Sequence, residues 1–196
     1  MARPRQSESV RVALLDKGVS SFLRTGYHGT GIKEVLDAVK VPKGSFYNYF
    51  ESKEAFAVAV VEHYAACFAK KMKDSMDGAS CPVDGLRHLF RRLAKDFEDN
   101  GFVGGCLIAN LGGELEGSEI CRNALSEAWT GWSNAVAEAL QEGQKEGLIR
   151  DDVEATTLAG LLTESWEGAV IRMKIERSTQ PLERVIERLL DDYFKP

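Results

Sequence analysis

The chain has 196 residues, of which 44% are hydrophobic and 28% charged. These values are ordinary for globular proteins and exclude a disordered, collagen-like or membrane-embedded chain. The N-terminus has no apolar stretch of signal-peptide length, and no run approaches the roughly 18 apolar residues of a membrane helix. We therefore expect a cytoplasmic protein with reduced thiols and no membrane partner.

The net charge of -5 is unevenly distributed. Residues 1–53 carry nine lysines and arginines against five acidic residues, a balance of +4, and residues 54–196 carry -9. A small basic segment on an acidic body suits a protein that neutralises phosphates at one end. Chance fluctuation in charge is the alternative explanation.

Cysteine spacing argues against a metal centre. The four cysteines are separated by 14, 25 and 15 residues, with no C-x-x-C pair and no nearby pair of histidines. Zinc sites have a different spacing. No glycine-rich phosphate loop joins a strand to a helix either. We therefore expect neither a metal nor a nucleotide cofactor.

Hydrophobic residues follow the 3.6-residue helical period along almost the whole chain, and no segment alternates like a strand. The sequence predicts an all-α fold of about nine helices. The first helix ends at Gly26 in a Thr-Gly signal, and Thr30 is a good N-cap for a second helix over Gly31–Val39. A third helix is predicted over Pro42–Tyr49, because proline suits a first helical turn. These helices form a three-helix N-terminal bundle.

The body continues with a long helix that Ser52 caps, and five more follow it. Their predicted ranges are about Lys53–Met76, Val83–Asn100, a start near Cys106, Ser118–Glu146, Val153–Lys174 and Pro181–Phe194. We divide the chain into a helix-turn-helix DNA-binding domain, residues 1–53, and a helical effector-sensing and dimerisation domain, residues 54–196.

The second and third helices meet at the tight Lys40-Val41-Pro42 junction inside the basic segment, as a helix-turn-helix requires. Many small helical bundles also have short helices and a proline turn. The arrangement by itself therefore leaves both interpretations open.

Residues 26–56, GYHGTGIKEVLDAVKVPKGSFYNYFESKEAF, closely resemble the signature of TetR-family repressors. A Gly-aromatic opening, a Thr-started helix, Val-x-Lys-Gly-Ser-x-Tyr and a final Phe-x-x-Lys recur there in this order. The resemblance implies a repressor that is not an enzyme and that faces DNA with Thr30, Lys43, Gly44, Ser45, Tyr47, Asn48 and Lys53. Two departures, Pro42 for a common Ser or Thr and Asn48 for a common His, put two phosphate contacts in question.

Each implied contact has a physical reason. Thr30 and Lys53 stand at predicted helix starts, where unpaired N–H groups and the helix dipole bind phosphate oxygens. Gly44 lets the backbone approach DNA closely, while Lys43 and Tyr47 offer a cation and a phenol.

Other residues of the N-terminal segment have structural or open roles. Phe46 and Phe50, four residues apart, are expected to face the core. Arg3 and Arg5 either form an arm along the DNA or belong to an ordinary solvated terminus.

One helix-turn-helix buries too little DNA surface for specificity, so we expect a homodimer with recognition helices about 34 Å apart on a near-palindromic double-stranded operator. The resemblance suggests that the two C-terminal helices pair with their copies as a four-helix bundle. The candidate apolar stripes are Leu158, Leu161, Leu162, Trp166 and Val170, and Leu182, Val185, Ile186, Leu189 and Leu190. The alternative is that these stripes serve only the core of the monomer.

Cys106 is the candidate sensor, because it follows two glycines at a predicted helix start where the dipole favours a thiolate. Isolated cysteines are more often small buried hydrophobes. The segments GFVGGCLIANLGGEL and IRMKIERSTQPLE resemble the NemR-type branch of the family, which responds to electrophiles and oxidants. That resemblance implies Cys106 as the sensing thiol and Lys174 as its partner. A solvated helix end beside Arg172 and Arg177 is the alternative for Lys174.

Three functions compete. The first is a repressor released when Cys106 is oxidised or alkylated. The second is a repressor induced by a small hydrophobic ligand, in a pocket lined by Phe97, Phe102, Trp129, Trp132 and Trp166. The third, a thiol enzyme, is disfavoured because His28, His63 and His88 all lie far from Cys106 in sequence.

Overall fold

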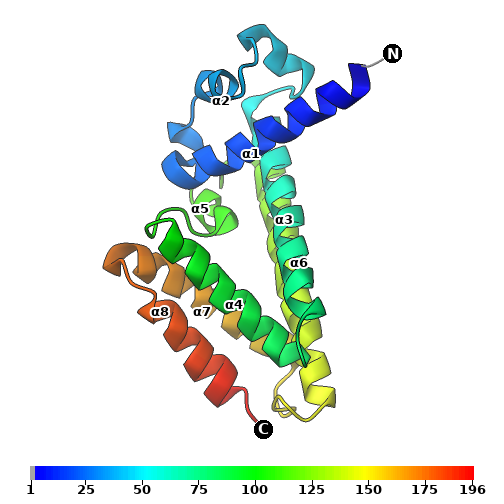
Figure 1. The fold of residues 1–196 in the computed structure, drawn as a ribbon, viewed down its shortest axis with the longest axis vertical. Helices are drawn as coiled ribbons and strands as arrows, with labels where there is room; N and C mark the ends of the chain where they lie inside the picture. Colours follow the sequence, from blue (N-terminus) through cyan, green and yellow to red (C-terminus); the bar gives the residue numbers. More distant parts are fainter. Residues whose placement is uncertain (1–2) are drawn as a thin grey trace. The chain divides into compact units, whose positions relative to one another are not determined.

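The computed structural model describes the backbone of residues 3–196 and the side chains of residues 8–42 and 44–196. Within this part of the chain every regular element is helical, which confirms the all-α prediction (Figure 1). The elements are α1 (Arg3–Gly29), α2 (Ile32–Val39), η1 (Lys43–Asn48), α3 (Lys53–Asp77), α4 (Pro82–Asp99), α5 (Leu107–Gly112), α6 (Glu119–Lys145), α7 (Ala155–Glu176), α8 (Gln180–Val185) and η2 (Ile186–Tyr193). Among these helices none is both long enough and apolar enough to cross a membrane.

Each predicted helix has a counterpart, with two differences in helix type. The third, η1, is a 3-10 helix of 6 residues rather than an α-helix. The last one begins as α8 and continues without a break into a π-helical stretch, η2. Short 3-10 pieces are common as connectors, and six residues are too few for periodicity to separate the two types.

The chain divides into two compact units. The first comprises the residues up to Ala66 together with Cys106–Ala128, and the second comprises Cys67–Gly105 and Trp129–Pro196. Helices α3 and α6 contribute residues to both units, and the chain passes from the second unit to the first between Gly105 and Cys106. The functional boundary at residue 53 is a different division and stays a prediction.

Aromatic rings form the core of the first unit around η1. Phe56 of α3 meets Phe22, Phe46 and Phe50 at centroid distances of 5.8, 5.8 and 4.8 Å. Phe46 and Phe50 are 3% and 5% exposed, so their predicted inward orientation is confirmed. Aromatic pairs at such distances stabilise beyond their burial. This core holds η1 against α1 and α3 and so positions the segment predicted to read DNA.

Helix α1 is kinked at Gly26, where the first helix was predicted to end, with φ 71° and ψ 179°, and it continues beyond the kink to Gly29. The predicted capping by Thr30 is wrong, because α2 begins at Ile32 with Gly31 as its N-cap and without a side-chain cap. The hydroxyl of Thr30 instead donates to the carbonyl of Gly26 at 2.7 Å. The kink at Gly26 leaves that carbonyl available, and the Thr30 side chain turns back to it.

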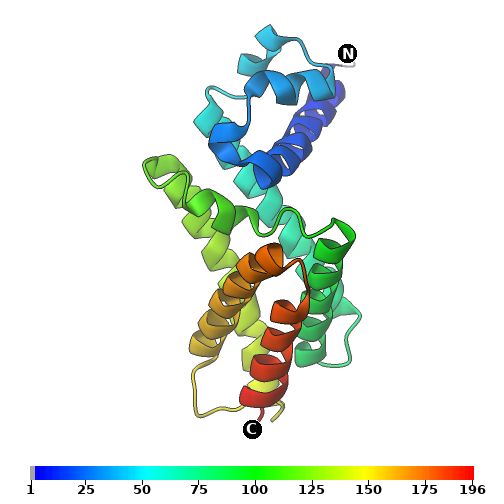
Figure 2. The ribbon, with the colours of Figure 1, turned by 90° about the vertical axis from the view of Figure 1, so that its left-hand side faces the viewer.

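The core of the second unit is built by α4, the C-terminal part of α6, α7 and the last helix, α8 with η2, and α7 and α8 lie side by side (Figure 2). On α4, Leu86, Leu89 and Phe90 are fully buried. The guanidinium of Arg87 donates to Asp191 at 2.6 and 2.9 Å and also pairs with Asp84. This half-buried ion pair ties α4 to η2.

Candidate functional site

The exposed face of η1 carries the predicted reading residues. Tyr47 is 74% exposed, and its ring packs edge-on against the buried Phe46 at 5.5 Å. Asn48 is also exposed and Ser45 is half-buried. The backbone N–H of Ser45 donates to the carbonyl of Pro42 at 2.8 Å. The 3-10 helix thus presents a phenol and an amide outward from an aromatic anchor.

Among the described residues, none requires a glycine at position 44. Its φ is not positive, and a Cβ added there would meet no atom within 4 Å. Glycine is otherwise required where the backbone must come close to a neighbour. Because the described residues supply no such neighbour, the glycine is consistent with a partner that approaches from outside.

Several predicted cations lie outside the described side chains or are already paired. The side chains of Arg3, Arg5 and Lys43 are outside the described residues. On α2, Lys33 pairs with Asp37 of its own helix at 2.7 Å. Not every lysine of this segment is therefore available to bind a phosphate, because Lys33 is already paired with a carboxylate.

Thr30 and Lys53 both make internal contacts at the end of α1. Thr30 is 1% exposed and its hydroxyl is bonded to the carbonyl of Gly26, so its contact with a phosphate stays a prediction. The ammonium of Lys53 donates to the carbonyl of Tyr27 at 2.7 Å and lies 4.3 Å from the centre of the Tyr27 ring. Burial lowers the pKa of Lys53, and the negative charge of Glu114 opposes that shift. Lys53 thus ties α3 to α1.

Glu114 is a contact that the sequence analysis missed. Its carboxylate accepts the backbone N–H of His28 at 3.0 Å, and its carbonyl accepts Nε2–H of His28 at 3.1 Å. The two residues are 86 positions apart, so no local pattern reveals their proximity. Only the Thr-Gly break at Gly26 marks the place where Glu114 docks.

Cys106 stands at the start of α5, as predicted. It is the N-cap residue, its carbonyl accepts the N–H of Asn110 at 3.0 Å, and it is 9% exposed. The thiol makes no side-chain cap. Since α5 has only 6 residues, its dipole is a weaker source of reactivity than the sequence suggested.

Lys174 lies in the last turn of α7 and is half-buried. A Cβ added to Gly105 would lie 2.7 Å from Cε and 3.0 Å from Nζ of Lys174. The side chain of Lys174 therefore rests on the backbone of the residue that precedes Cys106. This arrangement differs from the fully solvated helix end that was the alternative.

The loop before Cys106 has an unusual backbone. Gly101, Phe102, Gly104 and Gly105 all have positive φ, at 65°, 62°, 102° and 103°. Left-handed φ is strained for a residue such as phenylalanine and persists when neighbours hold it. Here Arg177, just after α7, donates to the carbonyl of Gly101 at 3.2 Å and lies 5.9 Å from the ring of Phe102.

The five predicted pocket aromatics are packed into or against the core of the second unit. Trp166 is 2% exposed and meets Phe90 at 4.6 Å, while Trp132 is 7% exposed. Phe97, Phe102 and Trp129 are partly buried against the same core. Ligand binding by this set stays a prediction.

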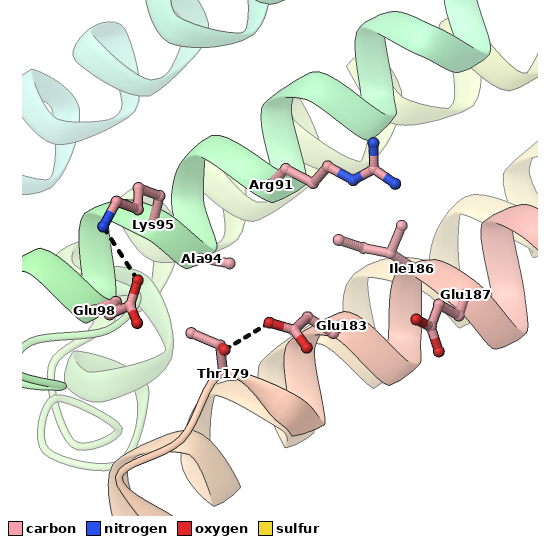
Figure 3. A pocket seen from close by; sticks show the side chains of 8 residues that line it. All are labelled: Arg91, Ala94, Lys95, Glu98, Thr179, Glu183, Ile186 and Glu187. Carbon is pink, nitrogen blue, oxygen red and sulfur yellow. Dashed lines mark hydrogen bonds and ion pairs between the residues drawn. The ribbon is translucent and has the colours of Figure 1, made fainter.

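A cavity of about 380 Å³ lies between α4 and the C-terminal helix, and none of the five predicted aromatics lines it (Figure 3). Its lining is mainly charged, with Arg91 and Lys95 on α4 and acidic residues on the facing helix. Lys95 is already paired with Glu98, and Glu183 accepts a hydrogen bond from Thr179. The described residues hold no group of three or more potential metal ligands, here or elsewhere.

Most of the predicted dimer stripe belongs to the core. The buried members are Leu158, Leu162, Trp166, Val170, Leu182, Ile186 and Leu190. These residues were expected to face a partner subunit, but they are buried within the monomer instead. The helical period reveals that a face is apolar but not which element covers that face. The outer side of α7 instead exposes Leu161, Gly168, Ile171 and Ile175, at i, i+7, i+10 and i+14.

Comparison with known proteins identifies relatives along both units. A family model described as "Bacterial regulatory proteins, tetR family" matches residues 14–60. A second, described as "Tetracyclin repressor-like, C-terminal domain", matches residues 82–189. Together they span the predicted reading segment and most of the body.

Individual relatives agree with these matches. The HTH-type transcriptional repressor DhaR of Mycobacterium sp. (strain GP1) is 37% identical over 179 residues, which are 90% of this chain and 88% of DhaR. The HTH-type transcriptional repressor NemR of Escherichia coli K12 is 34% identical over 178 residues, 90% of this chain and 89% of NemR. The crystal structure of reduced E. coli NemR has a TM-score of 0.85 at 31% identity, and covers 92% of this chain and 95% of that one.

Proposed function

Because the chain belongs to the TetR family and is a DNA-binding transcriptional repressor, we propose that each of two subunits inserts η1 into the major groove of a near-palindromic operator. Residues 1–53 read the DNA, and residues 54–196 sense the effector and dimerise in the cytoplasm. The supporting observation is Tyr47, a large ring that is 74% exposed beside a glycine with open space around it. Gly44, Tyr47 and Asn48 contact the DNA, together with Ser45 and Lys43.

Operator selection tests this part. Sequences captured from a random duplex pool by the purified protein are expected to be near-palindromes, because a symmetric dimer places its two recognition helices in successive grooves. A collection without twofold symmetry, or no capture at low ionic strength, would contradict it.

The dimer forms through the two C-terminal helices against a second copy of this chain, with the outer side of α7 as the apolar contact. Leu161, Ile171 and Ile175 are 39%, 57% and 76% exposed, and apolar side chains in one row favour burial. A Cβ added to Gly168, which lies between them, would meet no atom within 4 Å, so a second helix has room to approach closely. Family members act as dimers, which supports a second copy as the occupant.

Release from DNA follows alkylation or oxidation of Cys106, with Lys174 as the partner of the thiol. The observation that carries this proposal is the side chain of Lys174 resting on Gly105, directly before Cys106. A nearby cation favours the thiolate, which is the nucleophilic form of cysteine. In alkylation by a maleimide, the sulfur bonds to one carbon of the double bond and a proton from water adds to the other. The comparison with NemR, described in its reduced form, supports redox-linked behaviour.

A mobility-shift assay with N-ethylmaleimide tests the release mechanism. We expect alkylation to weaken operator binding by wild type by at least about fivefold, a usual coupling between two sites. Cys106→Ser should bind the operator and ignore the reagent. Equal loss of binding in wild type and Cys106→Ser would exclude Cys106 as the sensor.

A non-covalent inducer is the second candidate, supported by one observation. Nε1 of Trp132 is buried, and no acceptor among the described residues bonds to it. Trp132 packs against Phe68 and Trp129 at 5.4 and 5.3 Å, so a small aromatic or carbonyl ligand entering there would satisfy this donor. Ligand-dependent tryptophan fluorescence and thermal shift, equal in wild type and Cys106→Ser, would favour this candidate; their absence with a panel of such ligands would count against it.

A further inference from the structure

The last residues of α1 after its kink, together with Thr30, form a short stretch directly before α2, which we call the knuckle (Gly26–Thr30). At Gly26 the chain leaves the helical path, and α2 starts only at Ile32. Three separate segments bond to this short stretch. Thr30 closes it from within, Lys53 of α3 bonds to the carbonyl of Tyr27 at 2.7 Å, and Glu114 bonds to His28.

Glu114 makes the most extensive of these contacts. Its carboxylate accepts the N–H of His28 at 3.0 Å, and its backbone carbonyl accepts the His28 ring N–H at 3.1 Å. Its carboxylate also fills the space beside Gly26, where an added Cβ would overlap both of its oxygens. Because Gly26 combines a φ of 71° with this close approach, only glycine fits there.

Charge adds to this geometry. The carboxylate acts on the Lys53 ammonium and raises the pKa that burial lowers. The Lys53 ammonium donates to the carbonyl of Tyr27, and the Glu114 carboxylate accepts the N–H of His28. Two groups of opposite charge thus bond to neighbouring residues of the knuckle. Hydrogen bonds to charged groups are roughly twice as strong as those between neutral groups.

Glu114 is linked to Cys106 through α5. The carbonyl of Cys106 accepts the N–H of Asn110 at 3.0 Å, and the carbonyl of Leu111 accepts the N–H groups of Glu114 and Leu115 at 3.0 Å. Leu107 and Leu111 are fully buried and Leu115 is 4% exposed, so this short helix is anchored along one side. Hydrogen bonds and packing thus extend from Cys106 to Glu114 within the first unit.

We propose that Glu114 is the positioning residue through which a change at Cys106 reaches the DNA-reading helices. This inference rests on the proposed release by thiol modification. A group added to Cys106 displaces the start of α5, the displacement moves Glu114, and the knuckle loses the contacts that set the entry into α2. The knuckle then adopts arrangements in which η1 is no longer held in the geometry that binds the operator.

The first measurement is hydrogen exchange of the knuckle in the full-length protein without DNA. In wild type, the amide of His28 is expected to exchange slowly, because it is bonded to Glu114, and alkylation with N-ethylmaleimide should accelerate it. In Cys106→Ser the reagent should change nothing. If alkylation weakens operator binding by wild type but leaves exchange over residues 26–30 unchanged, the proposal is overturned without any further variant.

The second measurement compares operator binding before and after alkylation in three variants. Glu114→Ala removes the contact, Glu114→Gln keeps an acceptor for the His28 amide, and Glu116→Ala is a matched control because Glu116 is exposed in the same loop. We expect the alkylation response of Glu114→Ala to fall below about threefold, while Glu114→Gln and Glu116→Ala keep a response of at least about fivefold.

The outcomes separate the two proposals. If wild type and Glu114→Ala respond equally, Glu114 does not transmit the change, although release by thiol modification stands. If wild type itself does not respond, the thiol mechanism fails and the role of Glu114 fails with it. A simple folding defect would lower the melting temperature and operator affinity of Glu114→Ala but leave its response ratio at the wild-type value, and that result also refutes the proposal.

Discussion

Substituting alanine for Gly105 tests whether Lys174 supports the sensor thiol. Gly105 has a φ of 103°, and an added Cβ would lie 2.7 Å from Cε of Lys174. The neighbouring Gly104 has a φ of 102°, but a Cβ there would meet no atom within 4 Å. The two substitutions therefore share the backbone strain and differ in whether they displace the ammonium.

The strain sets the expected loss of stability. Forcing an alanine into left-handed φ costs about 1–2 kcal/mol. For a chain of this size that corresponds to a decrease of about 2–8 °C in melting temperature. The end of the Lys174 side chain can move aside, but the added Cβ would also lie 3.2 Å from Cγ1 of the buried Val170. Gly105→Ala should therefore lose about 1 kcal/mol more stability than Gly104→Ala.

The displacement of the Lys174 ammonium determines the expected change in the alkylation rate of Cys106. Without the nearby cation, alkylation of Cys106 by N-ethylmaleimide at neutral pH should slow by about 3- to 10-fold in Gly105→Ala. Gly104→Ala should react at close to the wild-type rate, and Lys174→Met should reproduce the slow rate. The rates come from mass spectrometry of the modified peptide, and the stabilities from thermal unfolding.

Additivity provides the refutation. If both substitutions act by removing the same ammonium, the double variant of Gly105→Ala with Lys174→Met should react no more slowly than either single variant. Multiplicative slowing, or equal rates for Gly104→Ala and Gly105→Ala, would show that Lys174 does not assist Cys106.

Tyr47→Ala should weaken operator binding by about 5- to 150-fold, as expected for the loss of about 1–3 kcal/mol of contact, without lowering the melting temperature. Tyr47→Phe should show how much of that loss is due to the phenol hydroxyl. A normal affinity of Tyr47→Ala in fluorescence anisotropy would show that Tyr47 does not contact the operator. Ile171→Glu combined with Ile175→Glu should yield monomers in sedimentation experiments, because two charges would be buried in the apolar contact, and an intact dimer would place the interface elsewhere. The hydrogen bond from Ser80 lowers the pKa of Asp84 below its ordinary 3.8, so its stabilising effect is present above pH 3.8 and is lost as pH falls through the lowered value. Asp84→Asn should therefore lower the free energy of unfolding at pH 7, and this penalty should shrink as pH falls below 3.8. A penalty that does not change with pH in urea titrations would contradict this.

Most of the helices and the candidate reading segment followed from the sequence because they depend on neighbours in the chain. A Thr-Gly pair ended the regular helix at Gly26, and Pro42 separated α2 from η1. Apolar spacing placed Phe46 and Phe50 inward and left Tyr47 exposed. The family signature in residues 26–56 and the comparisons with known proteins led to the same regulator family.

Side chains with alternative partners were harder to place. Thr30 fits the pattern of an N-cap, but its hydroxyl bonds to the carbonyl that the kink at Gly26 leaves available. Lys53 precedes a helix, as a phosphate ligand would, but its ammonium lies on Tyr27. A sequence indicates what a side chain is able to bond, whereas the choice among nearby partners depends on the folded backbone.

By itself, the sequence determined which segments are helical, which of their faces are apolar and which short helix carries exposed polar residues, because helical periodicity and capping act within a few residues. Only the tertiary structure decided that most of the α7 stripe is core while Ile171 and Ile175 face outward, that Lys174 rests on Gly105, and that Glu114 bonds to His28. These contacts join residues far apart in the chain, and their formation depends on how whole helices pack rather than on any local pattern.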